Sequence, residues 1–241
     1  MLGILLTVDG WMSLLTLIVM EIILGIDNII FISIIADRLQ PEKQQRARIT
    51  GLSLALLVRI GLLFSISFLV HLTNPLVTFS SYNFSIRDLI LIAGGLFLLY
   101  KTIIEIHHKI MGSEEVSLKK ATSFSTVIVQ IIIIDVVFSV DSILTAIGLV
   151  ENVLIMIIAV IVAMFFMILF ARSVSGFINR NPRIKMLALA FLLMIAFILI
   201  ADGFHFQIDK KYLYIAIAFS FLVEFLNMRE RANKKKKLVT E

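Results

Sequence analysis

The chain has 241 residues, of which 60% are apolar and only 16% charged, and its mean hydropathy is +1.03. This composition excludes a cytosolic enzyme and indicates an integral membrane protein whose main partner is the lipid bilayer. Because no cysteine is present, disulfides, thiolate metal ligands and thiol nucleophiles are excluded too. The net charge of +5 does not indicate nucleic-acid binding, since Lys and Arg lie in short connections between apolar runs and in one tail.

Hydropathy predicts an all-α, polytopic membrane protein with seven transmembrane helices. Each apolar run is about long enough to cross roughly 30 Å of hydrocarbon. The opening segment 1–10 has no basic region before the first run, so we expect it to stay uncleaved. The predicted helices are Trp11–Ala36, Ile49–Leu72, Leu89–Ile106, Phe124–Leu149, Val153–Ala171, Met186–Ala201 and Tyr212–Met228.

The basic residues predict how the chain is oriented in the cell membrane. The segments on the opposite side carry only Arg87, Lys210 and Lys211. By the positive-inside rule the N-terminus is therefore outside and the C-terminus cytoplasmic, with the tail 229–241 anchoring the last helix and no further domain after it. The predicted cytoplasmic side carries the tail and three groups of four: Arg38, Lys43, Arg46 and Arg48; Lys101, Lys109, Lys119 and Lys120; Arg172, Arg180, Arg183 and Lys185.

Two acidic strings indicate an internal repeat. The first helix contains Glu21-Ile-Ile-Leu-Gly-Ile-Asp27-Asn28, and the fourth contains Asp135-Val-Val-Phe-Ser-Val-Asp141-Ser142. Each string consists of an acid, three apolar residues, a small residue, another apolar residue, Asp and a small polar residue. Three spans per half would invert one half relative to the other, as in many transporters.

The repeat predicts a division of the chain into five segments. The first three-helix repeat is 1–112, a cytoplasmic linker is 113–121, and the second three-helix repeat is 122–208. The seventh helix, 209–228, is an addition to the repeats, and the basic cytoplasmic tail is 229–241.

The spacing of the acids leaves two helix geometries open. On an ideal helix Glu21 and Asn28 share one face, whereas Asp27 lies roughly 120° away, and the same holds for the fourth helix. A local unwinding at Gly25 and Ser139 would turn each Asp toward one cavity. The alternative is two straight helices that pack closely through their small residues.

Four carboxylates near the middle of the bilayer predict a cation pathway. Each costs about 2.5 to 3.5 kcal/mol on insertion scales, and Arg59 is the one deep basic residue available to pair with them. Like charges in one low-dielectric site need protons or a bound cation. The predicted metal ligands are the acids Glu21, Asp27, Asp135 and Asp141, with Asn28 and Ser142.

These ligands are hard oxygen donors, which suit Mn, Ca or Mg and not copper or zinc. We expect a transported divalent cation and no permanently bound cofactor. Candidate pathway or counter-charge residues besides Arg59 are Gln130, Glu105 and Asp202, although interfacial pairing of the last two is the simpler interpretation.

The two strings, in this order and spacing, resemble the signature of the TerC family of integral membrane proteins. Further matching stretches are Arg87-Asp-Leu-Ile-Leu through Gly94-Gly95, and Pro182-Arg-Ile-Lys-Met-Leu-Ala-Leu. The resemblance implies a seven-helix bundle related to the LysE transporter superfamily and a role in exporting manganese. Tellurium oxyanions, from which the family takes its name, fit poorly with a cavity of four carboxylates.

Metal transport is expected to be coupled to proton exchange, because carboxylates must lose protons to bind metal. Three other functions compete with metal transport. The acids could form a proton relay for export of a small organic solute. A membrane factor could deliver metal to exported proteins. An intramembrane aspartyl protease would need a Gly-x-Gly-Asp string, and Gly25-Ile-Asp27 lacks it, so we expect no enzyme.

Overall fold

The computed structural model of the chain describes residues 7–65, 73, 75–79, 82–111, 123–150, 152–206 and 208–240. Seven of its helices are long and apolar enough to cross a membrane, which confirms the predicted all-α membrane protein. A short antiparallel hairpin, β1 (Pro75–Phe79) and β2 (Tyr82–Ser85), lies in the second connection. The helices are α1 (Val8–Ala36), α2 (Pro41–Phe64), α4 (Ile86–Ile110), α6 (Phe124–Leu149), α7 (Val153–Arg180), α8 (Pro182–Gly203) and α9 (Lys210–Thr240).

Local sequence signals start these helices. Pro41 and Pro182 stand in the first turns of α2 and α8, where a missing N–H costs nothing. Ser85 and Asp88 form a capping box at the start of α4, each side chain bonding the other residue's backbone N–H. The side chain of Asn152 caps α7, and only residues 150–152 separate α6 from α7.

Several helices have other bounds than predicted. The second helix, predicted at Ile49–Leu72, begins at Pro41 and ends at Phe64, and residues 66–72 lie outside the described residues. Its polar first turns are helical because Arg48 reaches back to Asp37, with Nη2 to Oδ1 at 2.8 Å. The helices predicted to end at Ala171 and Met228 continue through basic residues, α7 to Arg180 and α9 to Thr240. A helix can continue there because long basic side chains reach the interface from within it.

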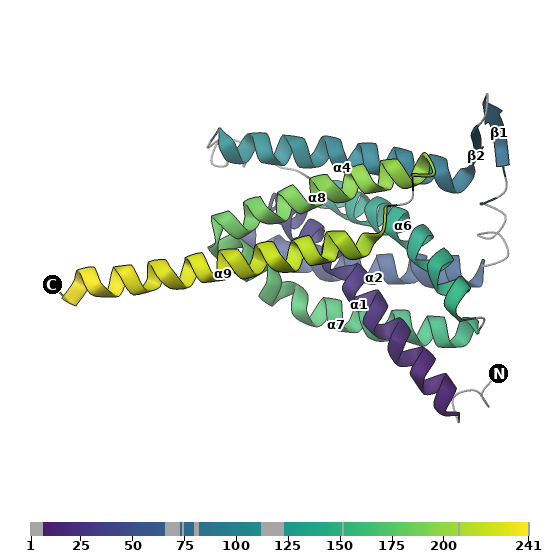
Figure 1. Cartoon of the computed structure of the whole chain (residues 1–241), viewed down its shortest axis with the longest axis horizontal. Coiled ribbons are helices and arrows are strands. Elements are labelled where there is room, and N and C mark those ends of the chain that lie inside the picture. Colours follow the sequence, from purple (N-terminus) through teal and green to yellow (C-terminus); the bar gives the residue numbers. More distant parts are fainter. Residues whose placement is uncertain are drawn as a thin grey trace.

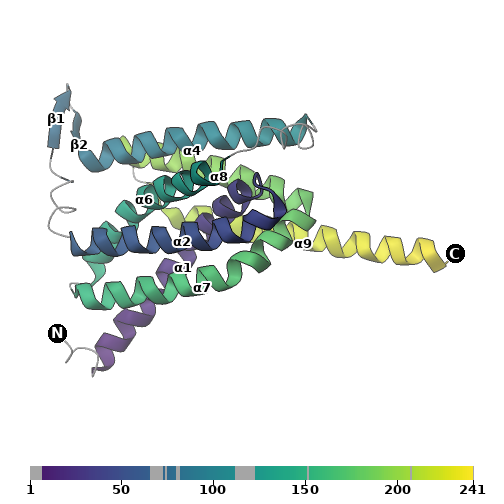
Figure 2. The same ribbon diagram turned by 180° about the vertical axis from the view of Figure 1, so that it is seen from behind.

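The bundle consists of helix pairs (Figures 1 and 2). α1 packs along α7, α2 packs along α6 and α7, and α4 packs along α8. The pairing is the same in both predicted halves. The first helix of each half packs on the second helix of the other half, α1 on α7 and α6 on α2. The inverted repeat itself stays a prediction, and so does the linker at 113–121, which lies outside the described residues.

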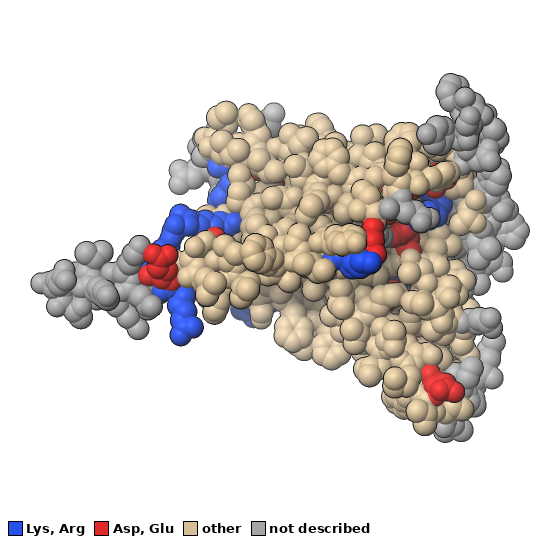
Figure 3. Space-filling model, in the orientation of Figure 1, with Lys and Arg blue, Asp and Glu red and all other residues tan. Residues whose placement is uncertain are grey.

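The surface is consistent with a bilayer around the middle of the bundle. The described N- and C-terminal residues lie at opposite ends of the bundle in Figure 1. A wide band of the face in Figure 3 carries no Lys, Arg, Asp or Glu, and basic side chains flank it where α9 leaves the bundle. Which end faces the cytoplasm stays a prediction from the positive-inside rule.

Both acidic strings lie on continuous helices. α1 is helical through Gly25 and α6 is helical through Ser139, so the local unwinding is not found and the continuous alternative holds. Gly25 serves packing against α7, because a Cβ there would lie 2.4 Å from Sδ of Met167. The first half of α1 is partly exposed, whereas every residue from Asp27 to Ala36 is buried.

Gly94 and Gly95 bring α4 close to two neighbours. A Cβ on Gly94 would lie 2.4 Å from both Cγ atoms of Val137 on α6. A Cβ on Gly95 would lie 2.9 Å from the carbonyl oxygen of Ala196 on α8. These contacts fix the distance of α4 from both helices.

We expect Gly94→Ala to destabilise the bundle by about 1–3 kcal/mol, because the β-branched Val137 cannot rotate both methyl groups away. Thermal unfolding of the purified protein in detergent should show a lower Tm. The matched control is Gly61→Ala, whose Cβ would meet nothing within 4 Å. Equal Tm values for the two variants would contradict the predicted close contact.

Candidate functional site

Arg59, in the last third of α2, holds two of the four predicted acids. Its Nη1 donates to Oε2 of Glu21 on α1 at 2.6 Å, and its Nη2 donates to Oδ1 of Asp135 on α6 at 2.8 Å. All three side chains are buried, with Arg59 only 2% exposed. One guanidinium therefore joins α1, α2 and α6 inside the bundle.

Asp135 accepts further hydrogen bonds that fix the neighbouring amide. Ser139 Oγ donates to Oδ2 of Asp135 at 3.2 Å, and Asn28 Nδ2 donates to Oδ1 at 3.5 Å. Because the amide nitrogen of Asn28 faces Asp135, its oxygen faces the other way. This buried oxygen, Asn28 Oδ1, has no hydrogen-bond partner in the part of the chain that the structure describes.

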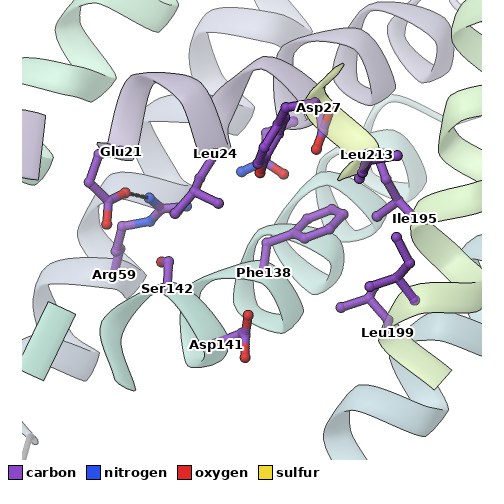
Figure 4. Close-up of a pocket in the computed structure, with 13 residues that line it drawn as sticks. Glu21, Leu24, Asp27, Arg59, Phe138, Asp141, Ser142, Ile195, Leu199 and Leu213 are labelled. Atoms are coloured by element: carbon purple, nitrogen blue, oxygen red, sulfur yellow. Dashed lines mark hydrogen bonds and ion pairs between the residues drawn. The ribbon is translucent and has the colours of Figure 1, made fainter. Parts of the chain in front are cut away.

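A cavity lies beside this cluster, between α1, α6, α8 and α9. It encloses about 540 Å³ of space not filled by atoms, its open side included. Figure 4 shows Glu21 and Arg59 on one side of the cavity, Asp27 and Leu213 on another, and Phe138 between them. The polar residues of the lining are Glu21, Asp27, Asn28, Arg59, Asp141 and Ser142, together with Tyr214.

Asp141 pairs with a second arginine. Nη2 of Arg87, at the start of α4, donates to Oδ1 of Asp141 at 2.6 Å. The Arg87 side chain is 27% exposed and that of Asp141 only 9%. This pair therefore reaches from the cavity wall to the end of the bundle that carries the hairpin.

α9 closes one side of the cavity although it is largely exposed. Leu213 and Tyr214 from its first turns line the cavity, and the Tyr214 phenol lies within electrostatic range of Asp27 and Asp141. Farther along, the Phe221 ring stacks on Phe191 of α8 at 6.2 Å. Most of α9 has no other protein neighbour among the described residues.

The remaining predicted pathway residues lie elsewhere. Gln130 is half-buried on α6 and Asp202 is half-buried in the last turn of α8, and neither lines the cavity. Glu105 pairs with Arg38 near the opposite end of α4 from Arg87, next to a small pocket that also contains Lys101. Glu105 is thus paired with Arg38 and not with Lys101, the basic residue one turn earlier on α4 with which the sequence pairs it, and the interfacial position of the pair stays a prediction.

The structure thus divides the four acids, which the sequence analysis placed in one cavity. Glu21 and Asp135 share Arg59, and Glu21, Asp27 and Asp141 line the cavity, whereas Asp135 does not. Among the described residues, no three Asp, Glu or His side chains are grouped closely enough to hold a metal ion. In this conformation the cavity offers separate carboxylates and neutral oxygens.

Sequence reasoning missed Arg87 and Tyr214. Arg87 was counted as an outer charge of the second connection, and the seventh helix was treated as an addition without a part in the site. The signals were present, since Arg87 precedes Asp88 at a helix start and Tyr214 puts a hydroxyl inside an apolar run. Neither signal indicates the partner, because the partners are far away in the sequence.

The fold and site define a polytopic membrane protein with a charged cavity between its helices. The chain belongs to the integral membrane protein TerC family, whose model matches residues 6–238, and the resemblance found in the sequence is confirmed. No solved structure matches the chain.

Curated relatives from Escherichia coli include two longer proteins and one of similar length. The chain is 46% identical over 228 residues to the UPF0053 protein YegH, covering 94% of this chain and 43% of YegH. It is 47% identical over 225 residues to the UPF0053 inner membrane protein YoaE, covering 92% of this chain and 43% of YoaE. It is 45% identical over 230 residues to the UPF0053 inner membrane protein YgdQ, covering 95% of this chain and 96% of YgdQ.

We expect Arg59→Met to lower the free energy of unfolding by about 3–5 kcal/mol, because it leaves two buried carboxylates without their counter-charge. The triple variant Arg59→Met, Glu21→Gln, Asp135→Asn should recover much of this loss, because it removes the charges as well. Thermal unfolding in detergent measures both, with Arg46→Met on the exposed surface of α2 as the control. A triple variant no more stable than Arg59→Met would contradict the electrostatic explanation.

Proposed function

We propose that this chain is a membrane transporter of divalent metal cations, with manganese as its substrate and export from the cytoplasm as its direction. Membership in the TerC family supports a transporter. The observation that carries the proposal is the buried cavity where Asp27 and Asp141 face a space beside the unpartnered Oδ1 of Asn28. An orphaned buried carbonyl oxygen is costly unless a donor or a cation meets it.

The chemistry of the lining supports a hard, partly hydrated cation. Carboxylate, amide and hydroxyl oxygens from Asp27, Asp141, Asn28 and Ser142 are ligands suited to Mn, Mg or Ca. Small hard cations keep several waters and need only one or two carboxylates, so separate acids around one cavity suit such an ion. Mg and Ca are the competing substrates to test.

The charge balance supports a divalent ion and exchange with protons. The four acids Glu21, Asp27, Asp135 and Asp141 are opposed by the guanidinium groups of two arginines, Arg59 and Arg87. The acids therefore outnumber the two guanidinium groups around the cavity, and Asp88 beside Arg87 adds a further carboxylate. A divalent cation or protons would offset this excess of negative charge, which makes proton antiport a natural coupling.

Export of an organic solute is less well supported. Such a substrate needs a cationic group to bind its carboxylate, and Arg59 was the candidate in the sequence. Both terminal nitrogens of Arg59 donate to protein carboxylates, so binding a substrate would leave one of those acids without its partner. A factor that delivers metal to exported proteins would use the same ligands but would bind metal without net flux.

We expect proteoliposomes containing the wild-type protein to move manganese when a pH gradient is imposed, with the N-terminus predicted outside and the C-terminus cytoplasmic in cells. Asp27→Asn and Asp141→Asn should each lower the flux at least about tenfold, because each removes a ligand charge.

The control for this experiment is Asp209→Asn, the same substitution at an exposed position outside the spans. Wild-type flux in either cavity variant would overturn the assignment of the site. Manganese binding without flux in the wild type would replace the transporter with the delivery role.

Asn28→Leu should weaken manganese binding about tenfold, because it keeps the branched shape of the side chain, at a larger volume, but removes the unpartnered oxygen. Equilibrium dialysis of the purified protein against manganese measures the Kd. Asn227→Leu, toward the other end of α9 from the cavity residues, is the matched control and should leave the Kd unchanged. An unchanged Kd in Asn28→Leu would exclude this oxygen as a ligand.

A further inference from the structure

The ion pair between Arg87 and Asp141 differs from the one that Arg59 makes. Arg59 is 2% exposed and lies between two buried acids. Arg87 is 27% exposed and contacts Asp141 from the helix end that begins at Ile86. One arginine is therefore enclosed, whereas the other lies between the cavity and the surface.

A second carboxylate lies beside Arg87. Oδ1 of Asp88 is 3.8 Å from Nη1 of Arg87, so this acid is close enough to attract the guanidinium without the short contact that Asp141 makes. The guanidinium thus has another partner if Asp141 is occupied.

Asp88 is held in place by groups other than Arg87. Its Oδ2 accepts from the backbone N–H of Ser85 at 2.8 Å and from the Ser85 hydroxyl at 2.6 Å, and it lies 2.9 Å from Nε2 of His205. His205 has a φ of 64°, a left-handed conformation that residues other than glycine rarely adopt. A pinned acid beside a half-exposed arginine provides a fixed second position for that arginine.

We propose that Arg87 is a tethered counter-cation for Asp141, which it occupies when the site is empty and leaves for Asp88 when a divalent cation binds. The guanidinium and the metal ion compete for the same oxygen, Oδ1 of Asp141. Arg87 is not part of the cavity lining, but while it is bound to Asp141 it ties α4 to α6 at the hairpin end, and we expect this link to limit access to the cavity from that end. The identity of the competing ion rests on the proposed function, whereas the effect of Arg87 on access to the cavity does not.

Competition predicts a specific change in affinity. In Arg87→Gln the competing charge is absent, so manganese should bind about three- to tenfold more tightly, as expected for a partly exposed ion pair. Arg87→Lys keeps the charge and should stay near the wild-type Kd. A purely structural role for Arg87 would instead weaken binding in both variants.

A second measurement tests closure without metal. Because the chain has no cysteine, Ser142→Cys places a single thiol in the cavity wall next to Asp141. A maleimide should label this thiol faster when Arg87→Gln is added to Ser142→Cys. Arg183→Gln, an exposed arginine at the start of α8, is the matched control for both measurements and should change neither the Kd nor the labelling rate.

The outcomes separate this proposal from the proposed function. Tighter manganese binding and faster labelling in Arg87→Gln, with Arg87→Lys close to the wild type, support the tethered counter-cation. Unchanged or weaker binding in Arg87→Gln, with a wild type that binds manganese, overturns it and leaves the transporter intact. If the wild type binds no manganese, the proposed function fails. Equal labelling rates of Ser142→Cys with and without Arg87→Gln would overturn the effect of Arg87 on access to the cavity.

Discussion

The organisation of the bundle depends on Arg59, a cation enclosed at the centre of a membrane protein. Neither this guanidinium nor Glu21 or Asp135 could be buried alone, because each isolated charge in hydrocarbon costs several kcal/mol. Together they form a unit that joins α1, α2 and α6. Asn28 is oriented by the same unit, since its amide nitrogen donates to Asp135 and its oxygen is thereby left without a protein partner.

The helices form two groups, and the cavity lies where they meet. α1, α2, α6 and α7 pack closely on one another, and α4 packs mainly on α8. The charged lining comes from the first group, whereas Ile195, Ile198 and Leu199 of α8 supply part of the apolar wall. Two ion pairs join the groups near opposite ends of α4: Arg87 with Asp141, and Glu105 with Arg38. A movement that opens the cavity at one end need break only one of these pairs.

The sequence predicted the spans, the family and the acids, and it left the pairing of charges unresolved. Apolar runs and the cost of burying a carboxylate are local properties, so the two strings could be found without a structure. The partners of Glu21 and Asp141 are 38 and 54 residues away, and nothing in a linear pattern says that Arg59 takes two acids and Arg87 a third. The start of α2 was misplaced for a different reason, because hydropathy detects only the apolar part of a helix, whereas Pro41 starts α2 in a polar segment that Arg48 ties to Asp37.

The charge of the cavity and the position of α4 are coupled through Arg87. An empty cavity needs a counter-charge for Asp141, since an ionised carboxylate is poorly solvated there, and the arginine that supplies it also links α4 to α6. In the proposed transporter a bound divalent cation would supply that charge itself, so the link would lose its electrostatic reason. The pair between Glu105 and Arg38 near the other end of α4 does not involve the cavity lining and keeps its attraction. Filling the site would thus loosen the two helix groups at one end only, which is the asymmetry that alternating access requires.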